Sequence, residues 1–311
     1  MDAAPICPVC GGASAQVSEL FAASTWPALT CPACRTTFLW PLPSVADLAP
    51  YYEYSRYGRP TYDPGSERGR SRVRDLEGLL ASIEARTAGP GTLVDLGCST
   101  GQMLEAGLHR GWRVTGIELD PDTARFTAER LGVEVVAGSA IQQLDSLGTF
   151  DLVVMSHWLE HVPAPGEAFQ RAAGHLRTGG LLLLRVPNAA SRLARFARTG
   201  WSWFSPGIHL IYFVPESLPA LAKRSGLDLI DARTVRGDAL SLPVELAIGV
   251  VRRILPTPDS TRGGPGPAGG ERGLVSSPLW RVANRALPPS SERFRRSNGG
   301  PELLALFERR S

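Results

Sequence analysis

The run Leu93-Val-Asp-Leu-Gly-Cys-Ser-Thr-Gly101, continued later by Gly116-Ile-Glu-Leu-Asp120, decides the fold of this 311-residue chain. A short apolar strand, a glycine-bearing turn and a helix start form the opening unit of an α/β sheet that binds ligands at its carboxyl edge. Gly97 and Gly101 allow the backbone to approach a ligand closely, and the helix N-terminus offers free amide groups. The turn spells neither Gly-x-Gly-x-x-Gly nor Gly-Lys-Ser/Thr, which disfavours dinucleotide dehydrogenases and phosphate-binding NTPases.

An acidic residue, Glu118, ends the next strand, 21 positions after Gly97. A carboxylate at this place can accept hydrogen bonds from both hydroxyls of a ribose, a bidentate and charge-assisted contact. The alternative is an ordinary solvated carboxylate at a strand end. Because NAD enzymes also carry an acid at the end of their second strand, the glycine spacing has to discriminate between the cofactors.

From residue 91 onward, short apolar segments alternate with amphipathic ones. Strands are expected at 92–96, 113–118, 133–137, 150–155, 181–186 and 227–234, and helices at 102–110, 121–131, 165–177 and 216–225. This alternation predicts an α/β fold, a doubly wound and mostly parallel sheet covered by helices on both faces. The segment Glu302-Leu-Leu-Ala-Leu-Phe307 is apolar enough to complete the sheet as a final strand.

The segments around this core divide the chain into five parts. We expect a zinc ribbon at 1–42, a linker and helix at 43–90, the main domain at 91–236, an insertion at 237–300 and the final strand at 301–311. A helix is predicted at 70–86 from apolar residues at i, i+3, i+4 spacing. The insertion should hold a capping helix at 240–255, followed by a mobile Pro/Gly/Ser-rich loop at 256–272.

Composition excludes several classes of function. No stretch approaches about 20 apolar residues, so no membrane-spanning helix is expected. The N-terminus has neither a basic segment nor an apolar one, so no secretory signal is expected and we predict a cytoplasmic protein. The net charge of +3 does not argue for nucleic acid. Arginine supplies 32 of the 33 basic residues, Lys223 being the exception, a bias typical of a GC-rich genome.

Four of the five cysteines form two knuckles, Cys7-Pro-Val-Cys10 and Cys31-Pro-Ala-Cys34. Two Cys-x-x-Cys turns at this separation can place four thiolates tetrahedrally around one Zn²⁺ ion. A redox pair or chance spacing is the alternative, and a reducing compartment favours metal over disulfides. Because a site with four cysteines is closed, we predict a structural zinc that does no chemistry.

Five motifs, in order, resemble those of class I S-adenosylmethionine (SAM)-dependent methyltransferases and span about half the chain. They are Val94-Asp-Leu-Gly-Cys-Ser-Thr-Gly101, Gly116-Ile-Glu118, Phe150-Asp-Leu-Val-Val-Met-Ser156, Leu159-Glu-His-Val162 and Leu176-Arg-Thr-Gly-Gly180. The resemblance implies a Rossmann-like sheet whose last strand is antiparallel. With the two knuckles, it implies an enzyme that uses SAM as cofactor and carries a structural zinc.

The resemblance also implies the residues that hold SAM. Asp95, Gly97 and Gly101 would line its methionine end, Glu118 would hold the ribose and Leu119 would pack on the adenine. The family usually has an acid for the adenine amino group at the end of the third strand. In its place this sequence has Ser139 and Ala140, so a hydroxyl or backbone group must substitute. The same cofactor site would include two further residues, Cys98 and Ser156.

Three histidines are candidate catalytic bases. His157 and His161 follow the fourth strand, at the edge where such sheets bind ligands, although the motif around His161 often serves packing. His209 lies in Trp201-Ser-Trp-Phe-Ser-Pro-Gly-Ile-His209-Leu-Ile-Tyr-Phe213. This segment resembles the acceptor-side insertion of zinc-ribbon methyltransferases that act on sugars, glycans and natural products. In relatives that methylate carbon, a glutamate precedes the histidine. Ile208 stands there in this chain, which leaves O- and C-methylation equally open.

The predicted reaction is therefore methyl transfer to a small acceptor, a sugar, glycan end or natural-product intermediate. Aromatic residues of the same segment, Trp201, Trp203, Phe204 and Tyr212, would line a sugar-sized pocket or form ordinary core.

Two other functions remain as alternatives. A zinc-ribbon rRNA base methyltransferase would need a basic surface, but residues 7–34 contain no Lys or Arg. We therefore expect no nucleic-acid partner. The other is a non-catalytic protein that keeps SAM or only the fold, and the intact Gly-x-x-x-Gly turn and Glu118 argue against a loss of cofactor binding. The sequence does not indicate an oligomeric state.

Overall fold

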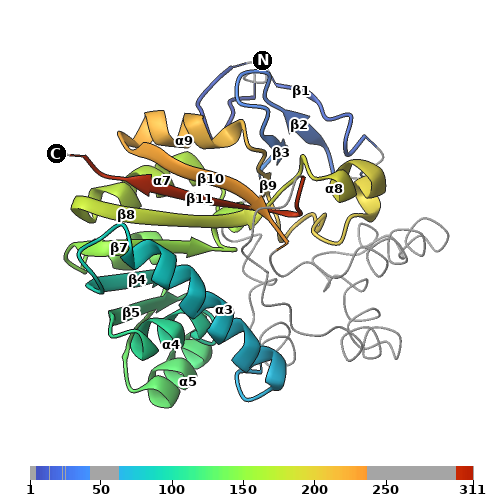
Figure 1. Cartoon of the computed structure of the whole chain (residues 1–311). Coiled ribbons are helices and arrows are strands. Elements are labelled where there is room, and N and C mark those ends of the chain that lie inside the picture. Colours follow the sequence, from blue (N-terminus) through green and yellow to red (C-terminus); the bar gives the residue numbers. More distant parts are fainter. Residues whose placement is uncertain are drawn as a thin grey trace.

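The structure is a computed structural model and describes residues 5–13, 15–22, 24, 26–42, 63–236 and 299–310. Its main sheet has seven strands, six of which fall within two residues of the predicted segments at each end. They are β4 (Thr92–Leu96), β5 (Arg113–Glu118), β6 (Glu134–Ala137), β7 (Phe150–Ser156), β8 (Leu176–Pro187), β10 (Asp228–Val235) and β11 (Glu302–Glu308). Their order is β10-β11-β8-β7-β4-β5-β6 (Figure 1).

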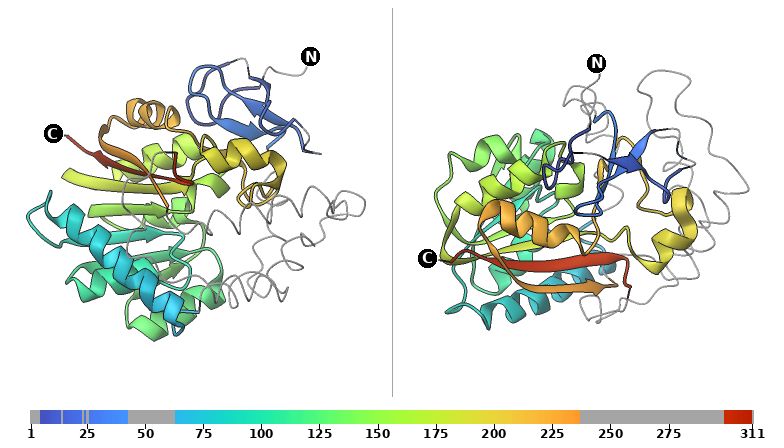
Figure 2. Two further views of the ribbon diagram at one scale, coloured as in Figure 1. Left: turned by 45° about the vertical axis from the view of Figure 1, so that its right-hand side comes forward. Right: turned by 90° about the horizontal axis from the view of Figure 1, so that it is seen from above.

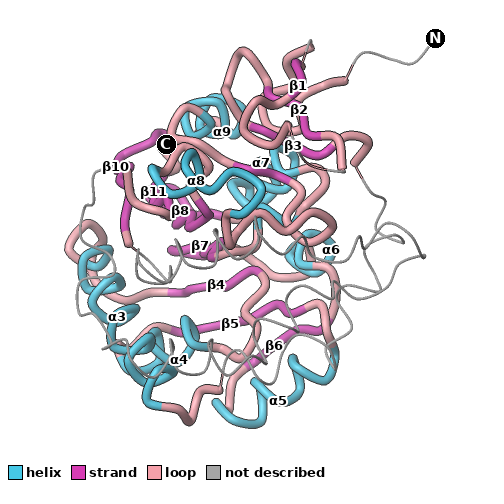
Figure 3. The backbone as a smooth tube through the Cα atoms, turned by 90° about the vertical axis from the view of Figure 1, so that its right-hand side faces the viewer, coloured by secondary structure: helices cyan, strands magenta, loops and turns pink. Residues whose placement is uncertain are grey.

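The sheet is mostly parallel, as predicted. Strands β4, β5, β6, β7 and β8 pair in parallel, whereas β11 is antiparallel to both β8 and β10. The predicted antiparallel last strand is thus confirmed, and it is inserted between two strands instead of closing the edge. Because they run in one direction, the five parallel strands end at one common edge. Figure 3 shows them side by side in the order β8, β7, β4, β5 and β6.

Helices cover both faces of the sheet. The α-helices are α3 (Glu67–Glu84), α4 (Gln102–His109), α5 (Pro121–Leu131), α6 (Ala140–Leu144), α7 (Pro165–Gly174), α8 (Arg192–Ala197) and α9 (Ser217–Ser225), with short 3₁₀ turns η2 (Leu159–His161) and η3 (Arg198–Gly200). Helices α3, α4 and α5 lie on one face, and α7 and α9 lie on the other (Figure 1).

The burial of the central strands explains the two layers. Along β8 the side chains of Leu182 and Leu184 join the core under α7 and α9, while Leu181 and Leu183 join the core under α3 and α4. Side chains alternate between the faces of a strand, so a continuous run of apolar residues is what a strand buried on both sides requires.

Local signals fix the helix ends. Asp120 caps α5 by accepting a hydrogen bond from the Thr123 N–H at 2.8 Å, and Pro121 begins the helix. One boundary prediction was wrong: α7 ends at Gly174, and residues 176–180 open β8. The backbone explains the difference, because Phe150 pairs with Leu176 and a bulge then shifts the register before Leu181.

The N-terminal module forms a second, four-stranded antiparallel sheet (Figure 2). Its strands are β1 (Gln16–Val17), β2 (Ala28–Thr30), β3 (Thr37–Leu39) and β9 (Ile211–Tyr212), in the order β1-β2-β3-β9. The fourth strand belongs to the segment that contains His209, and sequence patterns did not predict it. The cysteine module and this segment are therefore joined by backbone pairing, Thr37 with Tyr212 and Phe38 with Ile211.

Two predictions fall outside the described residues: the helix at 240–255 and the loop at 256–272. Among the described residues, no helix is long and apolar enough to cross a membrane.

Candidate active site

The β4–α4 turn and the end of β5 meet at the carboxyl edge of the sheet. Glu118, the last residue of β5, accepts hydrogen bonds from the backbone N–H groups of Ser99 at 2.9 Å and Asp120 at 3.1 Å. Gly97 and Gly101 have φ angles of +74° and +79°, which glycine adopts without strain. The turn thus wraps around the carboxylate, and each carboxylate oxygen keeps a further acceptor position for a ligand.

A second buried carboxylate lies behind this turn. Asp95 in β4 is only 4% exposed. Burial, reinforced by the negative charge of Glu118 and opposed by Arg185, raises the pKa of Asp95 to about 7. Burial also raises the pKa of Glu118. Because burial disfavours the charged form of both acids, a positively charged ligand would stabilise their ionised forms, and the sulfonium and amino groups of SAM would supply such a charge.

Replacing Asp95 with asparagine should stabilise the ligand-free protein above neutral pH. The unfolded chain deprotonates Asp95 near pH 4 and the folded one near pH 7, so folding opposes ionisation and stability falls as pH rises between these values. We expect Asp95→Asn to raise Tm by several degrees at pH 8, with a smaller gain at pH 5, and to weaken SAM binding at least about tenfold. Thermal unfolding at both pH values tests this, and equal shifts would contradict it.

The other residues predicted to hold the cofactor lie at the same edge, with one difference. Leu119 is 48% exposed directly after β5. Ser139 begins α6 without a side-chain capping bond, and Ala140 behind it is buried. Ser156 ends β7, where its hydroxyl accepts a hydrogen bond from Arg185 at 3.3 Å. The Cys98 side chain instead packs in the core against Met103 and Leu104, so only its backbone reaches the edge.

His157 is held between two buried carboxylates. Its Nδ1 lies 3.3 Å from Glu160 and its Nε2 lies 3.4 Å from Glu302. Burial alone would lower its pKa, but the charges and contacts of these carboxylates outweigh burial and raise the pKa to about 9. The ring also stacks on Trp203, with centroids 4.9 Å apart. This arrangement favours a charged, structural imidazole over a base.

Glu160, His161 and His209 form a second polar cluster, beside His157. One potential ligand atom from each lies within 4.8 Å of the other two. His161 Nδ1 contacts the carbonyl of Ile208 at 2.9 Å, and His209 Nδ1 contacts that of Trp203 at 2.7 Å. Burial and then the charge of His161 lower the pKa of His209 to about 3, so its ring is neutral at pH 7.

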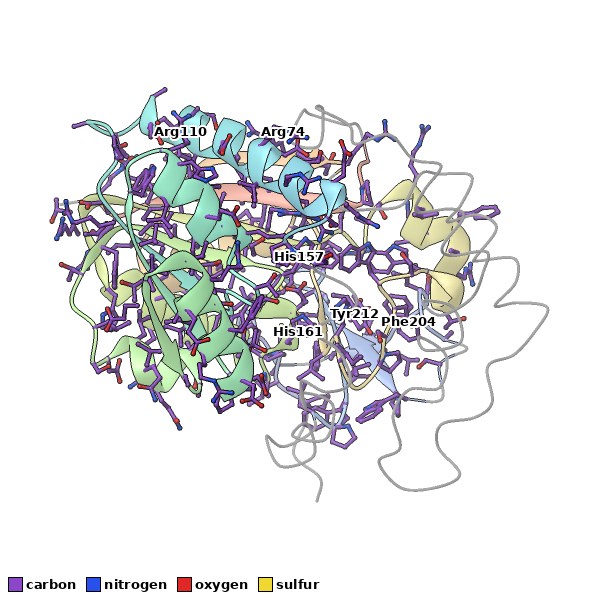
Figure 4. The ribbon with its side chains drawn as sticks, turned by 90° about the horizontal axis from the view of Figure 1, so that it is seen from below. Arg74, Arg110, His157, His161, Phe204 and Tyr212 are labelled. Atoms are coloured by element: carbon purple, nitrogen blue, oxygen red, sulfur yellow. The ribbon has the colours of Figure 1, made fainter. Side chains whose placement is uncertain are left out.

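The predicted catalytic histidines are thus brought together: His161 meets His209 edge to face, and Trp203 stacks on both His157 and His209. Figure 4 shows His157 and His161 among the side chains at this edge. Four aromatic residues of the segment around His209 were expected either to line a pocket or to form ordinary core, and they differ in this respect. Trp201, Phe204 and Tyr212 are buried, and Phe204 stacks on Phe21 of the cysteine module at 4.1 Å, as core residues do. Trp203 is partly exposed and lies against two histidines, so it is the aromatic residue of the four that the structure places at the cluster.

The four cysteines of the N-terminal module converge. Cys7 Sγ lies 3.6 Å from Cys34 Sγ, and Cys10 Sγ lies 3.6 Å from Cys31 Sγ. Sulfurs around a tetrahedral Zn²⁺ with bonds of about 2.3 Å lie about 3.8 Å apart, so these thiols fit zinc. None of the five cysteines is in a disulfide. Zinc here would be structural, since all four positions are taken by protein ligands.

The two knuckles repeat one backbone pattern. In the first knuckle, the Cys7 N–H donates to the Gly12 carbonyl and the Gly11 N–H donates to the Cys7 carbonyl. In the second knuckle, the Cys31 N–H donates to the Thr36 carbonyl and the Arg35 N–H donates to the Cys31 carbonyl. Arg35 takes the place of Gly11 and shares its positive φ, at 61° against 75°. The strained arginine is therefore explained by the turn that each pair of thiolates requires.

Sequence reasoning missed a buried ion pair next to this site. Arg185 in β8 donates to the Glu302 carboxylate of β11 at 3.0 and 3.1 Å, and both side chains are buried. Arg185 interrupts the apolar run from Leu181 to Val186, which was the available signal. Glu160 was also missed, because a single glutamate beside a histidine in Leu-Glu-His-Val does not show from sequence that it is buried.

Comparisons with known proteins define the class. A family model described as a methyltransferase domain matches residues 68–232, more than half of the chain. The ubiquinone biosynthesis O-methyltransferase of Xanthomonas axonopodis pv. citri (strain 306) is 30% identical over 170 residues, which are 50% of this chain and 69% of that protein. This chain is a SAM-dependent methyltransferase. Specifically, it belongs to the family described by that methyltransferase-domain model.

Solved structures show similarity as well. A putative sarcosine dimethylglycine methyltransferase from Galdieria sulphuraria has a TM-score of 0.50 at 15% identity, over 78% of this chain and 86% of that one; it shows the fold alone. SAM-bound CalS10, an amino pentose methyltransferase from Micromonospora echinaspora, is 30% identical over 38% of this chain and 51% of its own, with a TM-score of 0.35.

Proposed function

We propose that this enzyme transfers the methyl group of SAM to a hydroxyl oxygen of a small acceptor, a sugar, glycan end or natural-product intermediate. The observation that carries this proposal is the cluster of Glu160, His161 and His209 at the carboxyl edge of the sheet. Such a cluster can activate a hydroxyl, which is a weak nucleophile until its proton is removed. Curated relatives named as O-methyltransferases support oxygen as the acceptor atom.

In this proposal SAM lies along the edge formed by β4 and β5. Glu118 holds the ribose hydroxyls, Asp95 and the glycine turn line the methionine end, and Leu119 covers one face of the adenine. Ser139 and Ala140 lie near the adenine edge. The Cβ that a side chain at Gly97 would add lies 2.5 Å from Trp158 Cδ1. The cofactor turn is therefore in contact with the segment between β7 and η2, which leads to the histidine cluster.

Methyl transfer from a sulfonium is an in-line displacement, so the enzyme must align donor and acceptor and exclude water. The oxygen of the acceptor attacks the methyl carbon, the carbon–sulfur bond breaks, and the proton of the hydroxyl leaves toward the cluster. A neutral His209 suits this last step. Although Ile208 stands where a glutamate precedes the histidine in C-methylating relatives, Glu160 supplies a carboxylate beside His209 from η2.

The test is methyl transfer from isotope-labelled SAM to a panel of hydroxyl-bearing acceptors, including nucleotide-linked sugars, free glycosides and phenols. We expect His209→Ala to lower kcat by about 10² to 10⁴ and to leave the Kd for SAM within about threefold. His175→Ala is the matched control, because His175 caps the C-terminal end of α7 and contacts the Gly148 carbonyl. Equal turnover in His209→Ala would remove this residue from the reaction. Methylation of an RNA base but of no hydroxyl would overturn the proposal.

A further inference from the structure

We propose that Glu160, His161 and His209 bind a divalent transition-metal ion, at a site separate from the four-cysteine cluster. The three residues come from two segments, η2 and the turn before β9, that are 48 positions apart in the sequence. Pairing of β9 with β3 and a contact from Leu210 N–H to the Glu160 carbonyl at 2.9 Å hold these segments together. One carboxylate and two imidazoles form a frequent ligand set for such ions.

The two imidazoles are oriented as metal ligands usually are. Each ring uses Nδ1 to contact a backbone carbonyl, that of Ile208 for His161 and that of Trp203 for His209. Such a contact fixes the tautomer with the proton on Nδ1 and makes Nε2 the coordinating atom. The rings meet edge to face, with centroids 4.8 Å apart, so that neither covers the other.

Glu160 provides the independent observation that points to a cation. Its side chain is completely buried, and neither of its oxygens has a hydrogen-bond partner among the residues that the structure describes. A buried carboxylate is costly unless it is paired or coordinates a metal. His157, at 3.3 Å, faces one of the two oxygens, and His157 is shared with Glu302 at 3.4 Å. A cation between Glu160 and the other two rings would supply the contacts that the two carboxylate oxygens lack.

The dimensions suit a small ion after a modest contraction. Ligand atoms around a tetrahedral ion with bonds of about 2.1 Å lie about 3.4 Å apart, and those of the cluster lie within 4.8 Å. Three protein ligands leave one position open, as in catalytic metal sites. This step rests on the proposed function and makes His209 a ligand in place of a base: the acceptor hydroxyl would occupy the open position, the ion would lower its pKa, and its proton would leave to solvent.

The experiment measures the metal content of the full chain after reconstitution with Zn²⁺ under reducing conditions and removal of unbound metal. We expect Glu160→Gln and His209→Gln each to contain one equivalent of zinc less than the wild type. His109→Gln is the matched control, because His109 contacts Glu77 on the surface at 2.7 Å. It should retain the wild-type content.

Replacing zinc with cobalt(II) shows which of the two sites has lost its ion, because the two sites differ in their absorption spectra. An ion bound by Glu160, His161 and His209 adds d–d absorption without thiolate charge transfer, whereas one bound by cysteines adds both. We expect the variants to lose the first spectrum and to keep the second. Identical zinc content and cobalt spectra in the wild type and in Glu160→Gln and His209→Gln would overturn the metal site. SAM binding and the acceptor panel, measured on the same samples, report separately on the proposed function.

Discussion

Replacing Glu118 with alanine should weaken SAM binding by about 100-fold or more. Hydrogen bonds to a charged group contribute about 1.5 to 3 kcal/mol each, and the carboxylate would accept two from the ribose. A loss of about 3 to 4 kcal/mol corresponds to about 100- to 1,000-fold in Kd. Glu118 also receives the Ser99 N–H, so its removal loosens the cofactor turn in the same direction. Isothermal titration calorimetry measures the change.

Two control variants separate the ribose contact from general damage. Glu118→Gln keeps the shape but lacks the charge, so it should bind SAM with intermediate affinity. Glu134→Ala removes an exposed carboxylate from the opposite, amino-terminal end of β6 and should bind like the wild type. A Glu118→Ala protein that binds SAM with near-wild-type affinity would rule out the ribose role.

Replacing Cys34 with serine should cost the protein its structural zinc and much of its stability. The four sulfurs lie at tetrahedral distances, and structural zinc contributes directly to folding. The effect should extend beyond the module, because β3 pairs with β9 and Phe21 stacks on Phe204. We expect a loss of about 3 to 5 kcal/mol and a fall in Tm of about 10 °C, measured by thermal unfolding beside zinc content.

Cys98→Ser is the matched control for this prediction. Cys98 is the fifth cysteine and is buried in the core under α4, so its replacement should leave zinc content unchanged. A Cys34→Ser protein that retains zinc and Tm would show that the cluster does not bind the ion. Loss of zinc without loss of stability would instead show that the module folds without it.

Most of the main sheet was predictable because its signals are local. Apolar runs with flanking glycines gave β4, β5 and β7 within one residue, and Asp120-Pro121 gave the start of α5. The segment 176–180 was not predictable in this way, since Gly179 and Gly180 resemble a helix stop. What decides its structure is non-local: the pairing of Leu176 with Phe150 draws it into the sheet.

In the candidate site, too, the contacts between residues close in sequence were predictable and those between distant residues were not. The glycine turn and Glu118 are close in sequence and belong to one strand–helix–strand unit of two parallel strands, so their meeting could be expected. The meeting of Glu160 with His209 depends on β9, a strand of two residues that exists because the cysteine module supplies its partner. A strand that short has no periodicity to detect. Likewise, Arg185 and Glu302 are 117 positions apart, and only the insertion of β11 beside β8 brings them together.

Titration of SAM into the unchanged chain, beside a matched titration of NAD⁺, tests the central claim most directly: that the edge formed by β4 and β5 is a SAM site. We expect saturable binding of SAM at one site per chain and none of NAD⁺. A concentration of SAM about 100-fold above Kd should stabilise the fold by about 2.7 kcal/mol, a clear rise in Tm. No heat and no shift in Tm with SAM, or binding of NAD⁺ in its place, would contradict the account.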